Sequence, residues 1–343
     1  MEERTNRRGF KYHAVAGRHL KLNELKEVAR TSGVHNNYLF KEDILDYPRP
    51  EFHVCRLSHD TDGDGLWGIR REEGFMNLWG EGFVWWSLDV GPEERASAER
   101  RLLETTYPDR TEEQIQMQQS LLSKFASSPV LLSSSRLGSF RFTFPLKEVI
   151  RAYKEQFCGG AEPEMRVFET HLYRQEVMYA VLVHSPANQE QFNKYPLLTE
   201  DPDAVCCYRD GYFLWRPEAM CETHEYELVR RDSLKQLEAR RCCGKPRFYV
   251  WDNVTIAFHV DDQVLRFNVV RLRNSLSFCE RGSVVTNRET VFHDYPTADQ
   301  IVGQLWPDCP YPLWRGEEQE ETATGHQDVY YPHRPFMFPY PQY

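Results

Sequence analysis

The chain has 343 residues, of which 41% are hydrophobic and 13% aromatic, enough to fill the core of one large domain or two ordinary ones. Its formal net charge of −10 and its pI near 5.7 argue against a broad nucleic-acid interface, which needs a basic surface. No apolar run approaches the roughly 18 residues of a membrane span, and the polar start MEERTNRRGFKYH lacks the apolar core of a signal peptide. We therefore expect no membrane partner, and nine cysteines without a C-x-x-C pair indicate reduced thiols in the cytoplasm or nucleus rather than secretion.

Helices and strands alternate among the predicted elements of the first half. Residues 21–33 place apolar side chains on one helical face and end at Gly33, where a helix commonly stops. Residues 51–59 (EFHVCRLSH) have the apolar and β-branched composition of a strand. The next predicted elements are a strand over 80–90, helices over 91–104 and 111–126, a strand over 139–146 and a helix over 146–160.

After residue 160 the patterns are mainly those of strands. The predicted elements are two strands within 165–185, a hairpin over 206–215, a helix over 232–244, strands over 247–260 and 263–272, and a last helix over 297–306. Together these elements predict an α+β fold, in which mixed or antiparallel sheets form a cleft and helices flank them.

Three parts of the chain differ in composition. Residues 1–45 are a basic segment followed by the first helix, and residues 46–311 carry the patterns of an α+β core domain. Residues 312–343 are acidic and then rich in proline and aromatic residues, without periodicity, so we expect a disordered tail. Its tyrosines and prolines could bind a protein partner.

The motif HDTDGDG (59–65) has two interpretations. Asp60, Asp62 and Asp64 alternate and Gly65 follows them, as at the start of a calcium-binding loop. However, the twelfth position of such a loop needs a bidentate carboxylate, and Arg71 occupies it here. The segment before the motif also has the composition of a strand, whereas a calcium loop follows a helix. We therefore favour a polar turn between a strand and a short helix, which opens a pocket for a nucleotide rather than for calcium.

His53 and Cys55 are candidates for nucleophilic chemistry. They stand two positions apart in the strand predicted over 51–59, so their side chains should point to the same face. A cysteine beside a histidine suggests a thiol nucleophile, but the sequence offers no third residue that would orient the histidine. A buried, unreactive cysteine is therefore the favoured interpretation.

Zinc is a candidate ligand of the cysteines. CETH (221–224) has the C-x-x-H spacing of a zinc ligand pair, and pairs of adjacent cysteines stand on either side of it. The set that could bind zinc tetrahedrally is Cys207, Cys221, His224 and either Cys242 or Cys243. Because the cysteines do not form pairs separated by two residues, we favour no metal and keep zinc as the alternative.

Three segments carry a resemblance to a known family. FHVCRLSHDTDGDGLWGIRREEGF (52–75) has a strand with a histidine, a turn and a helix that ends in Gly-Phe; GEGFVWW (80–86) is a strand framed by glycines; and PRFYVWDNVTIAFHV (246–260) has two late strands. In this order they resemble the ADP-ribosyltransferases of the poly(ADP-ribose) polymerase type, in which a His-Gly-Ser/Thr strand leads to a helix ending in Gly-Phe or Gly-Leu. The resemblance implies an ADP-ribosyltransferase-like fold with NAD as its cofactor.

The resemblance also implies roles for single residues. His53 matches the histidine that holds the nicotinamide ribose. Val84 or Trp85 occupies the place of the tyrosine that stacks on the nicotinamide ring, and of the two only Trp85 could still stack. Cys55 replaces the serine or threonine, and Ser87 would line the same cleft. Arg247 stands where the family has its glutamate, so the charge is reversed and the usual electrostatic help to a cationic ribose is lost. Arg247 would instead face a pyrophosphate.

Transfer to an acceptor would then need a substitute acid. Glu169 and Glu176 are the candidates, although each fits equally well as a solvent-facing residue of a half-buried strand. We expect a catalytically degenerate ADP-ribosyltransferase-like domain that binds NAD or a related nucleotide and, if active, is a mono-ADP-ribosyltransferase. The alternative is a scaffold protein without enzymatic activity that binds a partner through its tail. The whole chain is also similar to vertebrate proteins induced in immune responses, which implies a place in innate immunity.

Overall fold

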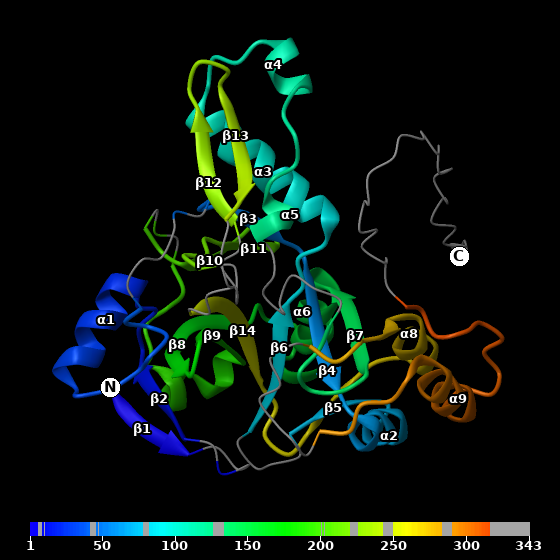
Figure 1. The fold of residues 1–343 in the computed structure, drawn as a ribbon. Helices are drawn as coiled ribbons and strands as arrows, with labels where there is room; N and C mark the ends of the chain where they lie inside the picture. The colour runs from blue at the N-terminus through cyan, green and yellow to red at the C-terminus, as the bar shows by residue number, and fades with distance from the viewer. Residues whose placement is uncertain are drawn as a thin grey trace.

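The computed structural model describes residues 1–5, 9, 11–41, 46, 48–77, 82–125, 134–199, 201, 203–219, 226–242, 250–282 and 290–315. Within these residues the largest element is a nine-stranded sheet with the order β1-β2-β8-β9-β14-β6-β4-β7-β16 (Figure 1). Its strands are β1 (Glu2–Thr5), β2 (Lys11–Ala16), β4 (Arg56–Thr61), β6 (Phe83–Leu88), β7 (Phe140–Pro145), β8 (Glu164–Tyr173), β9 (Glu176–His184), β14 (Trp251–His259) and β16 (Leu276–Phe278). Neighbouring strands are antiparallel except for β9 and β14, which run parallel. The predicted α+β class, with a mainly antiparallel and open sheet, is confirmed.

Smaller sheets and helices surround this main sheet. The smaller sheets are β10 (Cys206–Arg209)–β11 (Tyr212–Trp215)–β3 (Phe52–Val54), β12 (Tyr226–Arg231)–β13 (Gln236–Arg241), and β15 (Val264–Arg266)–β5 (Gly74–Met76). The helices are α1 (Leu22–Thr31), α2 (Gly63–Glu72), α3 (Pro92–Thr106), α4 (Glu112–Gln116), α5 (Leu122–Phe125), α6 (Leu146–Phe157), α7 (Gln189–Phe192), α8 (Val269–Asn274) and α9 (Tyr295–Leu305). The β12–β13 hairpin rises with α3 and α4 away from the main sheet (Figure 1). In the part of the chain that the structure describes, every helix is too short or too polar to cross a bilayer.

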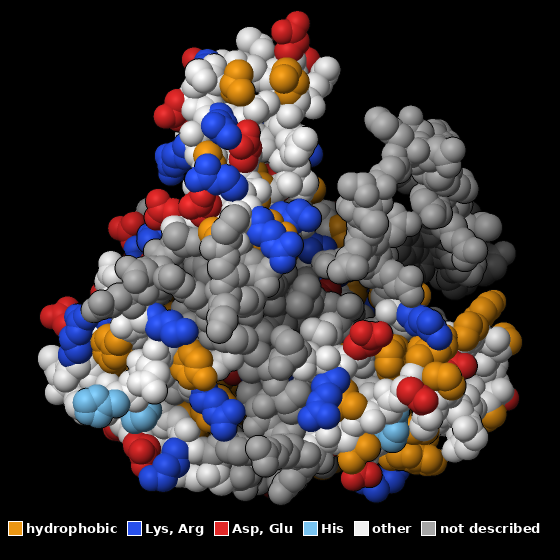
Figure 2. Space-filling model, in the orientation of Figure 1, with side chains coloured by type: hydrophobic (Ala, Val, Ile, Leu, Met, Phe, Trp, Pro, Cys, Tyr) orange, Lys and Arg blue, Asp and Glu red, His pale blue; other side chains and the backbone are white. Residues whose placement is uncertain are grey.

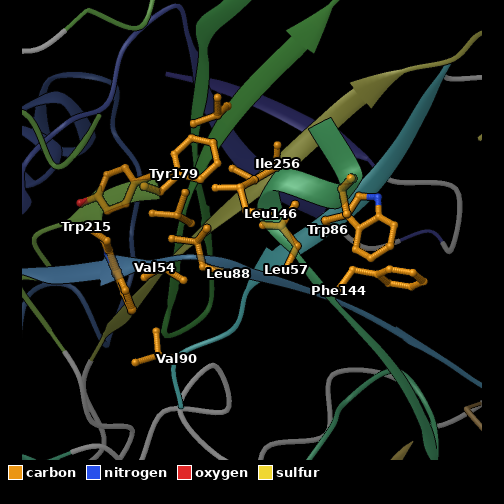
Figure 3. Packing of buried hydrophobic residues seen from close by; sticks show 14 of the residues in the cluster. Val54, Leu57, Trp86, Leu88, Val90, Phe144, Leu146, Tyr179, Trp215 and Ile256 are labelled. Carbon is orange, nitrogen blue, oxygen red and sulfur yellow. The ribbon is translucent and has the colours of Figure 1, made fainter. Parts of the chain in front are cut away.

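One face of the main sheet packs into the hydrophobic core. Side chains alternate along β6, so that Trp86 and Leu88 are fully buried whereas Trp85 and Ser87 are only half-buried. Figure 3 shows part of this core, with side chains from the main sheet and from the elements packed on it. We call this face of the sheet the apolar face, and its members used below are Leu57, Trp86, Leu88, Tyr179 and Ile256. Burying each such side chain contributes about 1.5–3 kcal/mol, so the apolar face is a main source of stability.

Local sequence signals correctly predict several elements. The hairpin between β10 and β11 turns at Asp210 and Gly211, whose φ angles of 50° and 86° are those of a type I′ turn. At the start of α4, the Thr111 side chain accepts a hydrogen bond from the Gln114 backbone N at 3.3 Å, and the Gln114 side chain accepts one from the Thr111 backbone N at 3.0 Å. This helix ends at Gln116 and α5 follows, so the single helix predicted over 111–126 is two short ones.

The strand predicted over 51–59 is two strands in different sheets. β3 ends at Val54 and pairs with β11, whereas β4 begins at Arg56 and pairs with β6 and β7 in the main sheet. The prediction was wrong because the residue pattern of one segment does not show that the chain changes partner at Cys55. The turn predicted after this strand is confirmed, since the Asp62 side chain caps α2 by accepting a hydrogen bond from the Gly65 backbone N at 3.0 Å.

Two later segments also differ from their predictions. The helix predicted over 232–244 is wrong, because β13 pairs along its length with β12 through a turn in which Lys235 has a φ of 52°. Leu237 is buried from a strand, so pairing with β12 and packing override the local helix propensity. The strand predicted over 263–272 is confirmed only for its first part, where β15 lies, and α8 occupies the second part. The Asn268 side chain caps α8 by accepting a hydrogen bond from the Val270 backbone N at 2.9 Å.

The first residues of the predicted tail pack against the core. Leu313 is buried, and Trp314 forms a β-bridge with Ser277 of β16. Residues 316–343 lie outside the described residues. The disorder and the partner binding expected for them therefore stay predictions.

Candidate functional site

The face of the main sheet opposite the apolar face carries polar side chains at its centre. In the register of β4, β6 and β14, Ser58 lies opposite Ser87, and Ser87 lies opposite Thr255. The row continues from Thr255 to Ala180 of β9, which lies opposite Glu169 of β8. Because paired residues project to the same side of a sheet, these five side chains share one face. We call it the polar face, and alternation along the strands adds further members: Trp85, Glu176, Asn253 and Ala257.

Trp85 supplies the aromatic surface of the polar face. Its ring lies against Phe168, with the centroids 6.2 Å apart and the planes at 24°. Both belong to a small apolar cluster that is separate from the main core: Phe83, Trp85, Phe168, Ala180, Leu182, Phe192, Tyr195 and Ala257. Since the indole is only half-buried, part of its surface is open to a flat ligand ring.

Glu176 is held as a carboxylate at the start of β9. Arg136 donates to both of its oxygens, at 2.6 and 2.8 Å, and the Asn253 side-chain amide donates to one of them at 2.9 Å. The guanidinium of Arg136 also lies over the Trp251 ring, 4.8 Å from its centroid. Burial raises the pKa of Glu176, but Arg136 and Asn253 lower it more, so the pKa lies below its usual value. Glu176 is therefore an ionised group with both oxygens engaged.

Glu169 forms a second ionised group near the edge of the same face. Its carboxylate contacts the ring Nε2 of His171 and the guanidinium of Arg4, which reaches it from β1. Burial raises the pKa of Glu169, but His171 and Arg4 lower it below its usual value. Glu169 pairs with Ala180, about 13 Å along β9 from Glu176 at the usual rise of a strand, so the two candidate acids belong to different local networks.

Two buried polar atoms of β14 have no hydrogen-bond partner among the described residues, one beside Glu176 and one opposite Ala180, about 13 Å further along the strand pair. They are Oδ1 of Asn253 and Oγ1 of Thr255, whose residues are 2% and 7% exposed. Leaving such a group unsatisfied costs about 1–3 kcal/mol. A ligand or water that supplies a donor to either atom would recover that cost, so Asn253 and Thr255 are candidate binding residues.

His53 lies away from the polar face. It belongs to β3, where its ring stacks on Tyr212 of β11 with the centroids 4.8 Å apart and the planes at 17°. Its Nε2 lies 2.9 Å from a carboxylate oxygen of Glu51. The structure therefore brings Trp85, Ser87, Glu169 and Glu176 to one face but keeps His53 in another sheet, because β3 pairs with β11 and not with β6.

Cys55 occupies the break between β3 and β4 and is exposed, so the buried cysteine favoured from the sequence is wrong, because the strand that would bury it ends at Val54. Its thiol contacts a carboxylate oxygen of Glu94 at 3.4 Å. Partial burial, and then the Glu94 carboxylate, raise the pKa of this thiol, which favours the unreactive protonated form. His53 bonds to Glu51 and not to Cys55, so the paired nucleophile considered for the strand over 51–59 is not formed.

The metal interpretations gain no support from the described residues. Cys207 lies in β10 and Cys242 follows β13 in a different sheet, while Cys221, His224, Cys243 and Arg247 lie outside the described residues. Within the described part of the chain no group of three His, Cys, Asp or Glu residues is placed to hold a metal. In the HDTDGDG motif, both oxygens of Asp60 bond to Arg141, at 2.7 and 2.8 Å, and are engaged within the protein.

No family model, curated protein or solved structure matches the chain. The resemblance to ADP-ribosyltransferases therefore stays a prediction, as do NAD and the role of Arg247. Asn253 and Thr255 are the site residues that the sequence reasoning missed. Their signal is present in WDNVTIAFH (251–259), where polar residues at alternate positions interrupt an otherwise apolar strand.

Proposed function

We propose that the chain is an ADP-ribosyltransferase-like domain that binds NAD or a related nucleotide at the polar face and has little or no transferase activity. The observation that supports this most is that Trp85 and Ser87 of β6 and Glu176 of β9, from two separate parts of the sequence, lie on one face of the sheet, which also carries the unpartnered polar atoms of β14. A sheet face that carries an aromatic ring, hydroxyls and an ionised acid suits a ligand with flat rings, hydroxyls and an amide.

Each group of the polar face has a role in this proposal. The half-buried indole of Trp85 would stack on the nicotinamide or adenine ring. Oδ1 of Asn253 and Oγ1 of Thr255 would accept hydrogen bonds from the carboxamide or a ribose hydroxyl. The ligand would thus satisfy atoms that are unsatisfied in the free protein, which favours binding.

The same geometry argues against efficient catalysis. An ionised acid stabilises a developing ribose cation only if its charge is available, and Arg136 already binds both oxygens of Glu176. His53, the expected ribose-binding residue, lies in another sheet. We therefore expect binding of NAD without appreciable turnover, as in a pseudoenzyme.

A scaffold function is the second candidate, and exposed apolar side chains favour it. Trp67 of α2 is 53% exposed, and Trp314 near the end of the described chain is 61% exposed. Apolar side chains gather over α8 and α9 at the lower right of Figure 2, where Val270 is also exposed. Such groups suit contact with another protein.

Thermal and chemical unfolding of the full chain with increasing NAD separates the two functions. At a NAD concentration a hundred times the Kd, the free energy of unfolding should rise by about 2.7 kcal/mol. A rise below about 0.3 kcal/mol at millimolar NAD would contradict nucleotide binding and favour the scaffold.

Two variants assign the ligand to the polar face. Trp85→Ala should weaken NAD binding by about 1–3 kcal/mol through loss of stacking, whereas Trp67→Ala, a matched control on α2, should leave it unchanged. Thr255→Val removes a hydroxyl without a protein partner, so it should preserve the fold and weaken NAD binding. Equal affinities for the wild type and both polar-face variants would place the ligand elsewhere.

A further inference from the structure

A cavity of about 470 Å³ lies between α3, the start of α1 and the ends of β3, β10 and β11. Figure 1 shows α3, β3, β10 and β11 together above the main sheet. Its volume falls within the range of about 300–1,000 Å³ that is typical of ligand pockets. None of the residues that line the cavity belongs to the polar face, so the cavity and the polar face are two separate sites in the described part of the molecule.

Two arginines of the cavity wall, Arg49 and Arg101, carry positive charges that form no ion pair with the described residues. Arg49 makes no hydrogen bond or ion pair with any described residue. Arg101 of α3 donates to the backbone carbonyl of Glu51, at 2.6 Å from Nη2 and 3.2 Å from Nε, and to the Ser97 hydroxyl at 2.7 Å. These acceptors are neutral, so an anion in the cavity would gain charge-assisted hydrogen bonds from both guanidinium groups.

Four acids also line the cavity, and two of them pair with lining cations: Asp203 lies 3.8 Å from Lys21 Nζ, and Glu51 binds Arg216. Glu51 accepts a hydrogen bond from Arg216 Nε at 2.8 Å and lies 2.9 Å from His53 Nε2. Glu218 accepts one from the backbone N–H at the start of α1. Glu104 differs, because its carboxylate has no hydrogen bond with the described residues and is open to a donor from a ligand. The wall thus offers guanidinium donors together with one kind of acceptor, a free carboxylate.

We propose that this cavity binds a phosphorylated small molecule that also carries hydroxyl groups, such as a sugar phosphate or a nucleoside phosphate. The phosphate would bind the planar guanidinium fork of Arg49, which matches phosphate oxygens, and the N–H groups of Arg101 that Glu51 and Ser97 leave free. The hydroxyls would donate to Glu104. His53 would act as a positioning residue, because its ring orients Glu51, which in turn fixes Arg216 at the wall.

Calorimetric titration of the full chain with ribose 5-phosphate and with AMP tests this site. Both probes should bind at low salt and less tightly at high salt. Arg49→Gln should weaken each by about tenfold through loss of a charge-assisted hydrogen bond. This variant should fold normally, because Arg49 is exposed and makes no contact that the fold needs. The matched control Arg71→Gln, on α2, should bind like the wild type.

The outcomes separate this site from the polar face. Tighter binding of AMP would identify a nucleoside phosphate as the ligand class, and tighter or equal binding of ribose 5-phosphate a sugar phosphate. For ribose 5-phosphate, which has no base to stack on Trp85, the variant Trp85→Ala should leave the affinity unchanged, whatever it does to NAD binding. The inference is overturned by the absence of ribose 5-phosphate binding at about 10 mM, by an Arg49→Gln variant that binds this probe like the wild type, or by loss of its binding in Trp85→Ala.

Discussion

The two faces of the main sheet are built from the same strands and serve different ends. On the apolar face, Trp86 and Ile256 are fully buried in the main core. On the polar face, one residue away along the same strands, Trp85 is half-buried and Thr255 carries an unsatisfied hydroxyl. The alternation of a strand thus separates the residues of the main core from those that we propose to bind a ligand, and substitutions on either side should have different effects.

The largest expected difference is between the two adjacent tryptophans. Trp86→Ala should lower the free energy of unfolding by about 4 kcal/mol, because it leaves a cavity in the core. Trp85→Ala should cost about half as much, since its ring is only half-buried. Denaturant titration would measure both, with Trp67→Ala as an exposed control. Equal losses at positions 85 and 86 would remove the distinction between the faces.

A charged pair on the polar face should have the next largest effect. Glu176→Gln should cost about 3 kcal/mol at pH 7, because it deprives the buried guanidinium of Arg136 of its carboxylate. The pKa of Glu176 lies below its ordinary 4.5, so its contribution is lost as the pH falls below that value. The difference between wild type and variant should therefore shrink in acid.

Glu148→Gln is the control for this prediction. Its carboxylate binds Arg271 with similar geometry in a more exposed place, and the loss should be about 1 kcal/mol or less. If denaturation curves show equal costs for the two variants, Glu176 is not the buried, structurally important acid that its contacts indicate.

Asp252 is a fully buried acid on the apolar face, where its neighbours along β14 are hydrophobic. Burial raises its pKa from 3.8 to about 8, although the backbone N–H groups of Glu218 and Ala219 oppose the shift. The folded protein then keeps a proton that the unfolded chain releases, so the free energy of unfolding should fall as the pH rises toward 8. Between about pH 6.5 and 8 the fall is about 2 kcal/mol.

Asp252→Asn should abolish most of this slope, because the amide does not titrate. Urea midpoints of the two proteins, measured at several pH values over the same interval, would check the prediction. A wild-type midpoint that rises between these pH values would mean that the side chain is ionised, and that the two N–H donors dominate over burial.

The smallest expected effect belongs to Thr255. Thr255→Val replaces an unsatisfied hydroxyl by a methyl group of similar size, so the ligand-free protein should be unchanged or more stable by up to about 1 kcal/mol. Calorimetric unfolding without ligand would show it. Destabilisation by more than about 1 kcal/mol would indicate that the hydroxyl is satisfied in the protein, which weakens its assignment to a ligand.

Local signals explain which elements the sequence could predict. The hairpin turn at Asp210-Gly211 and the capping box of Thr111 and Gln114 depend on neighbouring residues, and both form as expected. The failures are those in which a distant partner decides. Within the segment 232–244, β13 forms a strand because it pairs with β12. The segment 51–59 divides into two strands because its first part pairs with β11 and its second part with β6.

The candidate site was predictable only in part for the same reason. Trp85, Ser87 and Glu176 were selected from the sequence, but their common face depends on the register of β6, β14 and β9, which no local pattern reveals. His53 is assigned to the same site by the sequence, but its strand pairs with β11 and its ring stacks on Tyr212, so it lies in another sheet. The unsatisfied atoms of Asn253 and Thr255 could be recognised only with side chains in place.

At Cys55 the chain passes directly from the three-stranded sheet that contains β3 to the main sheet that contains β4. Glu51 at the cavity and Ser58 on the polar face stand on one taut stretch of backbone, at most about 25 Å long. Because Cys55 alone separates β3 from β4, no loop lies between them that could accommodate a displacement of β3. We therefore expect a ligand that displaces β3 to displace β4 as well, and β4 pairs with the strand that carries Trp85.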